Sequence, residues 1–197
     1  RAGVTRLAKS ELAAAAVEAC SPAVGRGAAR EELERITARL MLSHQAGLRL
    51  GEIASLTWGD VLTAEGQVRD RIHLKGVKTK GGVARTVFLN KRLQRQIQNF
   101  LSGLQGLPSP YAPLIRSQKG KAFSANSLCQ LFAQIYRRAG IDGATSHSGR
   151  RGFITKLAHS GVSPKVIMEL AGHKHLGTTQ RYIDVDDDMK RSAVEII

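Results

Sequence analysis

Apolar residues recur at helical spacing through most of the chain, which predicts a mainly helical protein. In residues 30–46 they fall on one face, and Gly47 follows as a stop. The pattern after Asn90 is clearest, because five apolar residues repeat there at the spacing of one buried helix face: Leu93, Ile97, Phe100, Leu101 and Leu104. The same criteria predict helices at residues 10–20, 48–56, 124–139, 164–170 and 186–197, and one that ends at residue 159.

Three short stretches carry the pattern of β-strands instead. Residues 68–75 alternate between apolar and basic side chains, so this strand is expected to bury one face and expose a basic one. Residues 85–89 follow a glycine-containing turn at residues 78–82, and residues 58–61 are predicted to form a first strand. We therefore expect an α+β fold, mostly helical, with a small three-stranded antiparallel sheet. The proline-containing stretch 106–121 predicts a loop.

The charge balance indicates what kind of partner the protein binds. Thirty Lys and Arg residues against sixteen Asp and Glu residues give a formal net charge of +14 at pH 7. An excess this large on a small domain is typical of proteins that bind polyanions, of which the phosphates of DNA or RNA are the usual ones.

Cysteine usage and hydropathy restrict the class further. Cys20 and Cys129 have neither the spacing of metal ligands nor that of a disulfide framework, which favours a reducing cytosol. There is no apolar run as long as a membrane span and no signal-peptide pattern. We therefore expect a cytoplasmic protein that binds nucleic acid and uses no metal or other cofactor.

Four groups of polar residues stand out in the predicted helices and turns. They are Arg49 with Glu52, Lys78 with Lys80, His147 with Arg150, and His173 with Tyr182. Taken singly, each has an ordinary structural explanation: a surface ion pair, a solvated turn, a helix cap, and a loop histidine near a packing tyrosine. Together they supply what phosphodiester chemistry without a metal requires. That set is a nucleophile, two guanidinium groups for the non-bridging oxygens, and proton donors for the leaving oxygen.

In this combination the chain resembles the catalytic domain of the tyrosine recombinases, the phage integrase and Xer family. The resemblance spans roughly residues 30–185, and its motifs occur in the family's order and at its spacings. These motifs are residues 47–52 (GLRLGE) with Leu56, Trp58 and Asp60, residues 79–82 (TKGG) before residues 85–89 (RTVFL), residues 147–150 (HSGR), and Gly172 and His173 with Thr178, Thr179 and Tyr182.

The resemblance implies a nucleophile and a phosphate clamp. Tyr182 would attack the scissile phosphate, form a 3′-phosphotyrosyl link and release a 5′-hydroxyl. Arg49 and Arg150 would hold the pentacoordinate phosphate, a task that suits guanidinium because its planar fork contacts two phosphate oxygens at once. Since the covalent intermediate keeps the bond energy, rejoining the strand would need neither ATP nor a metal.

The resemblance also implies supporting roles. Lys80 would be the general acid that protonates the departing 5′-oxygen, with Lys78 as the competitor for this role; Lys80 stands at the family's distance from the following strand. His147 would assist proton transfer, and His173 would hydrogen-bond the phosphate. Glu52 would orient the neighbourhood of Arg49.

Domain organisation and partners follow from the same resemblance. We expect one C-terminal-type catalytic domain over residues 1–197, with an opening helix and linker in residues 1–29 and no N-terminal core-binding domain. The final helix at residues 186–197 would pack on a neighbouring protomer. The implied activity is site-specific recombination of double-stranded DNA (integration, excision or resolution) by a homo-tetramer on the DNA. The protein, bacterial or phage-encoded, would act in the cytoplasm at the nucleoid, and the resemblance does not specify an accessory DNA-bending protein.

Three positions depart from the family's common pattern. Gly149 and Arg151 stand where many members carry leucine and histidine, and Ala171 replaces a usual leucine. None of these changes removes a catalytic group, so they concern local packing rather than chemistry.

Two alternative functions remain compatible with the sequence. One is type IB topoisomerase-like relaxation of DNA by the same chemistry, and the other is a DNA-binding module that keeps the fold without catalysis. A metal site built from His147, His173 and His175 is disfavoured, because no acidic or cysteine partner accompanies the two loop histidines.

Overall fold

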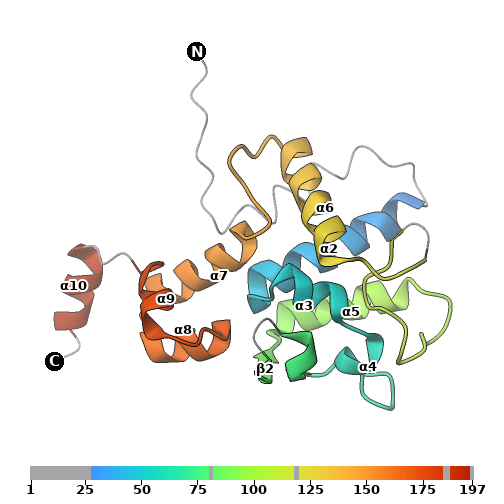
Figure 1. The fold of residues 1–197 in the computed structure, drawn as a ribbon, viewed down its shortest axis with the longest axis horizontal. Helices are drawn as coiled ribbons and strands as arrows, with labels where there is room; N and C mark the ends of the chain where they lie inside the picture. The colour runs from blue at the N-terminus through green and yellow to red at the C-terminus, as the bar shows by residue number, and fades with distance from the viewer. Residues whose placement is uncertain (1–27, 80–81, 118–119, 184–186, 196–197) are drawn as a thin grey trace.

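Helix α2 (Ala28–Ala46) runs through the middle of the protein, which is known here from a computed structural model (Figure 1). The structure describes residues 28–79, 82–117, 120–183 and 187–195. α2 packs against α5 (Lys91–Ser102) on one side and α7 (Ser148–His159) on the other. It agrees with the helix predicted at residues 30–46, and Gly47 ends it with a positive φ of 62°. The helix predicted at residues 10–20 lies outside the described residues.

Helix α5 forms where the apolar periodicity was clearest. The Asn90 side chain caps its first turn by accepting a hydrogen bond from the Leu93 backbone N–H at 2.9 Å. Four of the five expected apolar residues are buried: Leu93, Ile97, Phe100 and Leu101. The fifth, Leu104, is partly buried and packs against the same cluster.

The sheet is smaller than the sequence predicted. Strands β1 (Arg71–Leu74) and β2 (Arg85–Phe88) pair antiparallel, with Ile72 opposite Val87. The burial of β1 alternates as expected, with its two apolar residues inside and its two basic residues exposed. A short 3₁₀ helix, η2 (Gly76–Lys78), follows β1.

The strand predicted at residues 58–61 is wrong, because this segment is helix α4 (Trp58–Val61), just after α3 (Leu50–Ser55). The Asp60 carboxylate accepts hydrogen bonds from the Thr57 backbone N–H at 2.7 Å and hydroxyl at 2.8 Å, and this closes a helical turn. Leu62 then meets Val68 in a single isolated bridge. In the described part of the chain the antiparallel sheet therefore has two strands instead of three.

The C-terminal half is a succession of helices. Predicted helices appear as α6, α7, α8 and α10, and a short helix α9 lies in a stretch where no helix was expected. Their bounds are Ala125–Arg138 for α6, Pro164–Ala171 for α8, Leu176–Gln180 for α9 and Asp187–Val194 for α10. No helix in the described ranges combines the length and the apolarity needed to cross a membrane.

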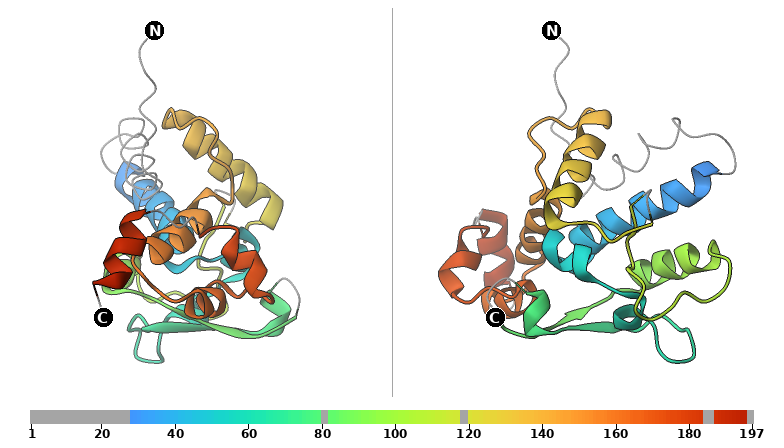
Figure 2. Two further views of the ribbon diagram at one scale, coloured as in Figure 1. Left: turned by 90° about the vertical axis from the view of Figure 1, so that its left-hand side faces the viewer. Right: turned by 45° about the vertical axis from the view of Figure 1, so that its right-hand side comes forward.

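Two apolar clusters hold these elements together. The larger is built around α2 to α6 and the hairpin, and the smaller joins α7 to α8 through Ile154, Ala158, Ile167 and Ala171. The hairpin extends along one edge of the molecule, and its strand β2 contacts α8 (Figure 2). A seam between β2 and α8 therefore joins the two clusters.

Gly149 allows α7 to approach α2 closely. A Cβ atom at this position would lie 2.6 Å from the Ser43 hydroxyl oxygen and 2.7 Å from the His44 ring, so a leucine here would collide with α2. The His44 ring is itself held in place, because its Nε2 is hydrogen-bonded to the Tyr136 hydroxyl of α6 at 2.8 Å. The departure from the family pattern at Gly149 thus has a packing reason.

The half-buried His44 makes the stability of the fold depend on pH. Burial lowers the pKa of His44 from 6.5 to about 4. Because the unfolded chain takes up this proton below pH 6.5 and the folded chain does not, stability is full above pH 6.5 and falls as the pH drops toward 4. We expect a loss of about 2 kcal/mol by pH 5 from this group.

Chemical denaturation at pH 7 and pH 5 measures that loss. The variant His44→Gln should show a much smaller difference between the two pH values than the parent protein. The exposed His159 of α7 is the matched control, and His159→Gln should retain the full difference. An unchanged pH dependence in His44→Gln would contradict the assignment.

Candidate active site

Arg49 lies at the start of α3 and is held on both sides. Its Nη1 donates to Glu52 Oε1 at 3.0 Å, and its Nη2 donates to the carbonyl oxygen of Gly172 at 2.9 Å. The Arg49 backbone N–H also donates to Glu52 Oε2 at 2.8 Å. The expected pairing of Arg49 with Glu52 is therefore present, and it is tied to a segment 123 residues further along the chain.

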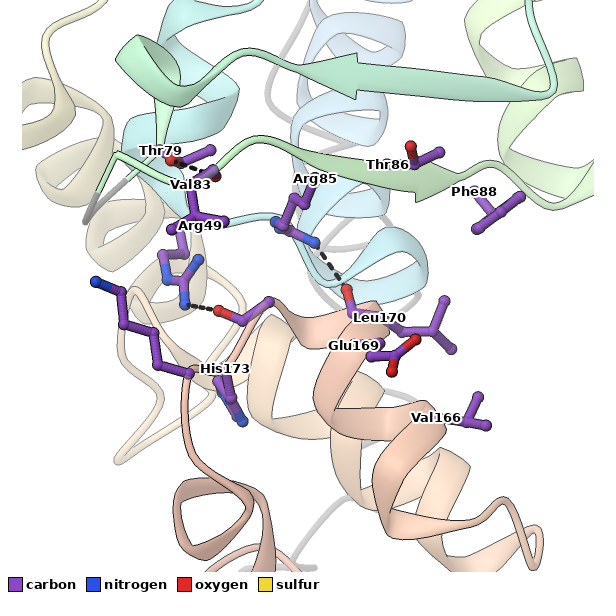
Figure 3. A pocket seen from close by; sticks show the side chains of 12 residues that line it. Arg49, Thr79, Val83, Arg85, Thr86, Phe88, Val166, Glu169, Leu170 and His173 are labelled. Atoms are coloured by element: carbon purple, nitrogen blue, oxygen red, sulfur yellow. Dashed lines mark hydrogen bonds between the residues drawn. The ribbon is translucent and has the colours of Figure 1, made fainter.

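A second arginine completes this arrangement. Arg85, the first residue of β2, donates from Nη2 to Glu52 Oε2 at 2.8 Å and from Nη1 to the Leu170 carbonyl oxygen at 2.7 Å. Figure 3 shows Arg49 and Arg85 side by side above the C-terminal end of α8. Glu52 is thus a buried carboxylate, 1% exposed, that two guanidinium groups share.

Electrostatics keep the Glu52 carboxylate ionised. Burial alone would raise the pKa of Glu52, but the hydrogen bond and charge of Arg85, together with the backbone N–H and charge of Arg49, lower the pKa below its usual value. The site therefore contains a fixed negative charge between two fixed positive charges.

Sequence reasoning gave Arg85 no role beyond its place in a strand motif. A signal was available: in a strand, Arg85 shares a face with Val87 and Leu89, and both of these are buried. A charged residue on an inward face needs a buried partner, and in the structure that partner is Glu52, which Arg49 also binds.

Arg150 enters the same site from α7. Its guanidinium is buried and donates from Nη1 to the Gly47 carbonyl oxygen and from Nη2 to the Ala171 carbonyl oxygen. Burial, with the nearby positive charges of Arg49 and Arg85, lowers the pKa of Arg150 to about 9. Three arginines therefore converge between α3, β2, α7 and the end of α8, and Arg150 stays cationic at neutral pH.

His173 and Tyr182 lie close to this arginine cluster. The Nδ1 of His173 is hydrogen-bonded to the hydroxyl of the buried Thr179 at 2.8 Å. The His173 ring stacks on the Tyr182 ring, with centroids 6.0 Å apart and planes inclined by 23°. Burial and then the charges of Arg150, Arg49 and Arg85 lower the pKa of His173 to about 4, so its imidazole is neutral at pH 7.

Tyr182 follows α9 and packs at the edge of the smaller apolar cluster. Its backbone N–H donates to the Thr179 carbonyl oxygen at 3.0 Å, so α9 sets its position. Its side chain is half-buried and lies close enough to Arg150 for the two to interact electrostatically.

Gly172 makes the approach of these segments possible. Its φ of +63° ends α8 in a left-handed conformation, and a Cβ atom here would lie 2.5 Å from the Arg85 side chain. Only glycine fits this position without displacing Arg85, the residue that binds Glu52.

The remaining residues expected at the site are His147, Lys80 and Lys78. His147 precedes α7 and is exposed; its backbone N–H donates to the Thr145 hydroxyl oxygen at 3.3 Å, and within the described residues no hydrogen bond or ring contact joins it to the arginines or to His173. Lys80 lies outside the described residues. Lys78, its competitor, forms a salt bridge with Asp60.

A cavity of about 520 Å³ opens beside the arginines. It lies between β2 and α8, and Arg49, Arg85 and His173 line one end of it (Figure 3). The described residues contain no group of three or more His, Cys, Asp or Glu side chains that could hold a metal ion. The histidine-based metal site considered from the sequence is therefore not assembled by the described side chains.

Three arginines, a neutral histidine and a tyrosine thus lie around one surface of a mainly helical fold, and comparison with known proteins specifies the family. The phage integrase family pattern matches residues 12–189, so the chain belongs to the phage integrase family. It is 32% identical over 193 residues to the tyrosine recombinase XerC of Methylobacterium sp. (strain 4-46), covering 96% of this chain and 58% of that protein. Tyrosine recombinase XerA of Pyrococcus furiosus is 31% identical over 157 residues, 79% of this chain and 52% of that protein.

Solved structures share the fold. The crystal structure of XerA recombinase superposes with a TM-score of 0.70 at 22% identity, over 93% of this chain and 62% of that chain. XerH recombinase in a post-cleavage complex with a palindromic difH substrate gives a TM-score of 0.67 at 21% identity, over 93% and 50% of the two chains. The chain spans about half the length of the curated relatives that it matches.

The shared carboxylate yields a stability prediction. Glu52→Gln removes the charge that Arg49 and Arg85 share and leaves both guanidinium groups without compensation. We expect the free energy of unfolding at pH 7 to fall by about 3 kcal/mol. Since the pKa of folded Glu52 is lowered, the difference from the parent protein should shrink as the pH falls below 4.5.

Chemical denaturation of both proteins checks this, with Glu169→Gln as the control. Glu169 pairs with Lys165 at 3.6 Å, but both side chains are well exposed, so its loss should change stability little. Equal effects of the two substitutions would contradict the central role of Glu52.

Proposed function

We propose that this chain cuts and rejoins DNA strands by site-specific recombination through a 3′-phosphotyrosyl intermediate. The observation that carries this proposal is the convergence of Arg49, Arg150, His173 and Tyr182, which come from four separate segments, at one surface. Membership in the phage integrase family supports the same chemistry.

In the proposed reaction the Tyr182 phenol gives up its proton with the assistance of His147, its oxygen attacks phosphorus, and the bond from phosphorus to the 5′-oxygen breaks. The phosphate becomes linked to Tyr182, and the 5′-oxygen leaves as a hydroxyl after receiving a proton. The reverse reaction with another 5′-hydroxyl rejoins a strand, so neither ATP nor an external nucleophile is consumed.

Arg49 and Arg150 would stabilise the negative charge on the non-bridging oxygens. Each Nη atom carries two hydrogens, and the bonds to Glu52 and to backbone carbonyl oxygens use only part of this capacity. The guanidinium groups are therefore already oriented before DNA binds, which is the condition for electrostatic stabilisation of a transition state.

His173 fits the role of a neutral hydrogen-bond donor. Thr179 occupies its Nδ1, which leaves Nε2 for a phosphate oxygen. Because the pKa of His173 is lowered to about 4, this contact would not depend on protonation near neutral pH. We assign the general acid to Lys80 and assistance in proton transfer to His147. The salt bridge of Lys78 with Asp60 favours Lys80 over Lys78.

The proposed partner is double-stranded DNA. The net charge of +14 favours a polyanion, and XerH, a structural relative, was solved bound to its difH substrate. We propose a tetramer on DNA and a location at the nucleoid. DNA relaxation by the same chemistry remains the second candidate, whereas a silent DNA-binding module is disfavoured by the assembled arginine cluster.

The phosphotyrosine predicts a covalent complex with DNA. The probe is a pool of nicked duplexes with a randomised central sequence, in which the short 5′-hydroxyl fragment diffuses away after cleavage. In EDTA the protein should form an adduct that survives a denaturing gel, and sequencing the adducts identifies the preferred site.

Tyr182→Phe should abolish the adduct, because the variant lacks the attacking oxygen. Tyr111→Phe is the matched control, since Tyr111 is 89% exposed in the loop after α5 and should leave the yield unchanged. An adduct that requires Mg²⁺, or one that persists in Tyr182→Phe, would overturn the mechanism.

We also propose that α10 packs on a neighbouring protomer. Its Val194 is 69% exposed, so part of its apolar surface is not buried within its own domain. A chain truncated after Val185 should assemble more weakly on a selected DNA site, as measured by sedimentation. Assembly equal to that of the intact chain would count against this role.

A further inference from the structure

Thr179 is a polar residue that the fold buries completely. It lies in the short helix α9 and is 0% exposed. Its hydroxyl oxygen lies 2.8 Å from Nδ1 of His173, which belongs to the segment between α8 and α9. Buried polar groups are normally hydrogen-bonded, and this bond satisfies the Thr179 hydroxyl. The contact therefore joins the histidine of the candidate site to the interior of the domain.

Burial of the Thr179 hydroxyl bears on the direction of this hydrogen bond. If Nδ1 of His173 carried a proton and donated it, the hydroxyl would accept, and its own hydrogen would need a second acceptor. Among the described residues, the hydroxyl of Thr179 has no hydrogen-bond partner besides His173. Because an unsatisfied buried donor is costly, this arrangement favours the hydroxyl as donor and Nδ1 as acceptor. The single proton of the neutral imidazole is then on Nε2.

The same threonine also positions the tyrosine. The Thr179 carbonyl oxygen accepts a hydrogen bond from the Tyr182 backbone N–H at 3.0 Å. The Tyr182 ring stacks on the ring of His173, with centroids 6.0 Å apart. The backbone of His173 is held separately, because its N–H donates to the Met168 carbonyl oxygen at 2.9 Å where α8 ends. Thr179 thus contacts the histidine through its side chain and the tyrosine through its backbone.

His173 lies at the arginine end of the cavity, which Arg49 and Arg85 also line (Figure 3). Since Thr179 takes up Nδ1, the nitrogen left for a ligand is Nε2. The guanidinium groups already supply positive charge here, so the neutral imidazole can add one directed N–H. With the proton on Nδ1 instead, Nε2 would present a lone pair, which repels a phosphate oxygen. The position of one proton therefore decides whether the ring attracts or repels the phosphate.

We propose that Thr179 is a positioning residue that fixes the proton of His173 on Nε2 and holds this ring against Tyr182. The inference rests on the proposed strand-cleavage reaction, in which the Nε2–H of His173 donates a hydrogen bond to a non-bridging phosphate oxygen while Tyr182 attacks. His173 keeps its proton throughout this step. Thr179 acts through His173, because its own side chain is buried.

The tautomer of His173 can be measured on the protein without DNA. In ¹⁵N NMR spectra a protonated and an unprotonated ring nitrogen have well-separated shifts, and the His173 signals are assigned by their loss in His173→Gln. At pH 7 we expect the parent protein to carry this proton on Nε2. Thr179→Val replaces the hydroxyl by a methyl group of similar size and should give a mixture of the two tautomers. A parent protein with the proton on Nδ1 would overturn the inference.

Adduct formation measures the consequence for the reaction. The substrate is the nicked duplex with the sequence selected from the random pool, and single-turnover rates are measured at saturating protein. We expect Thr179→Val to react about 10-fold more slowly, because a fraction of the rings present a lone pair or a misplaced N–H to the phosphate. Thr179→Ser keeps the hydroxyl and should retain the parental tautomer and most of the rate. The control is Thr155→Val, at a half-buried threonine of α7, which should match the parent in both measurements.

A double variant separates positioning from a general loss of structure. His173→Ala removes the donor and should slow the reaction by about 100-fold. Adding Thr179→Val should cause no further loss, since a residue that acts through His173 then has nothing to position. An equal loss in both backgrounds, or a Thr179→Val protein with the parental tautomer and rate, would show that Thr179 has no such role. If Thr179→Val folds poorly, Thr179→Cys takes its place, because a thiol is only a weak donor.

The proposed function and this inference fail in different ways. If the parent protein forms no adduct with any duplex in the pool, the proposed function is overturned, and the role of Thr179 in cleavage is overturned with it. If the parent forms the adduct and Tyr182→Phe abolishes it, while Thr179→Val changes neither the tautomer nor the rate, only the role of Thr179 is overturned.

Discussion

The buried carboxylate of Glu52 is the interaction on which the rest of the site depends. It lies between Arg49 and Arg85, and those two side chains also bind the backbone carbonyl oxygens of Gly172 and Leu170. One acid therefore joins α3, β2 and the end of α8, which otherwise belong to two apolar clusters. Removing a partner from such a buried pair is strongly destabilising because the remaining charge is left uncompensated.

The three arginines of the site carry more positive charge than the one carboxylate of Glu52 offsets. Arg49, Arg85 and Arg150 lie close enough for the first two to lower the pKa of the third, while Glu52 is the carboxylate that opposes them. Backbone carbonyl oxygens supply the remaining partners, and these are dipoles that do not neutralise charge. A phosphate entering this surface would supply the missing negative charge, while His173, already neutral, would add a hydrogen bond and no further positive charge.

Much of the helical fold followed from local patterns. Residues such as Asn90, Leu93 and Ile97 specify α5 through capping and 3.6-residue periodicity, which need no distant contacts. The segment 58–61 was mispredicted because its apolar residues resemble a strand, whereas the Asp60 hydrogen bonds to Thr57 close a helical turn. A strand pattern repeats every two residues. A four-residue segment contains too few of these repeats to outweigh the hydrogen bonds of a helix cap.

The sequence alone determined the identity of the chemical groups, because Arg49, Glu52, Arg150, His173 and Tyr182 stand in an order and at spacings that indicate one family. Only the tertiary structure decided how the groups are held. The sharing of Glu52 by Arg85, the carbonyl partners of Arg150 and the pairing of Lys78 with Asp60 join residues 18 to 103 positions apart. Such contacts depend on how helices and strands pack, and local propensity contains no information about them.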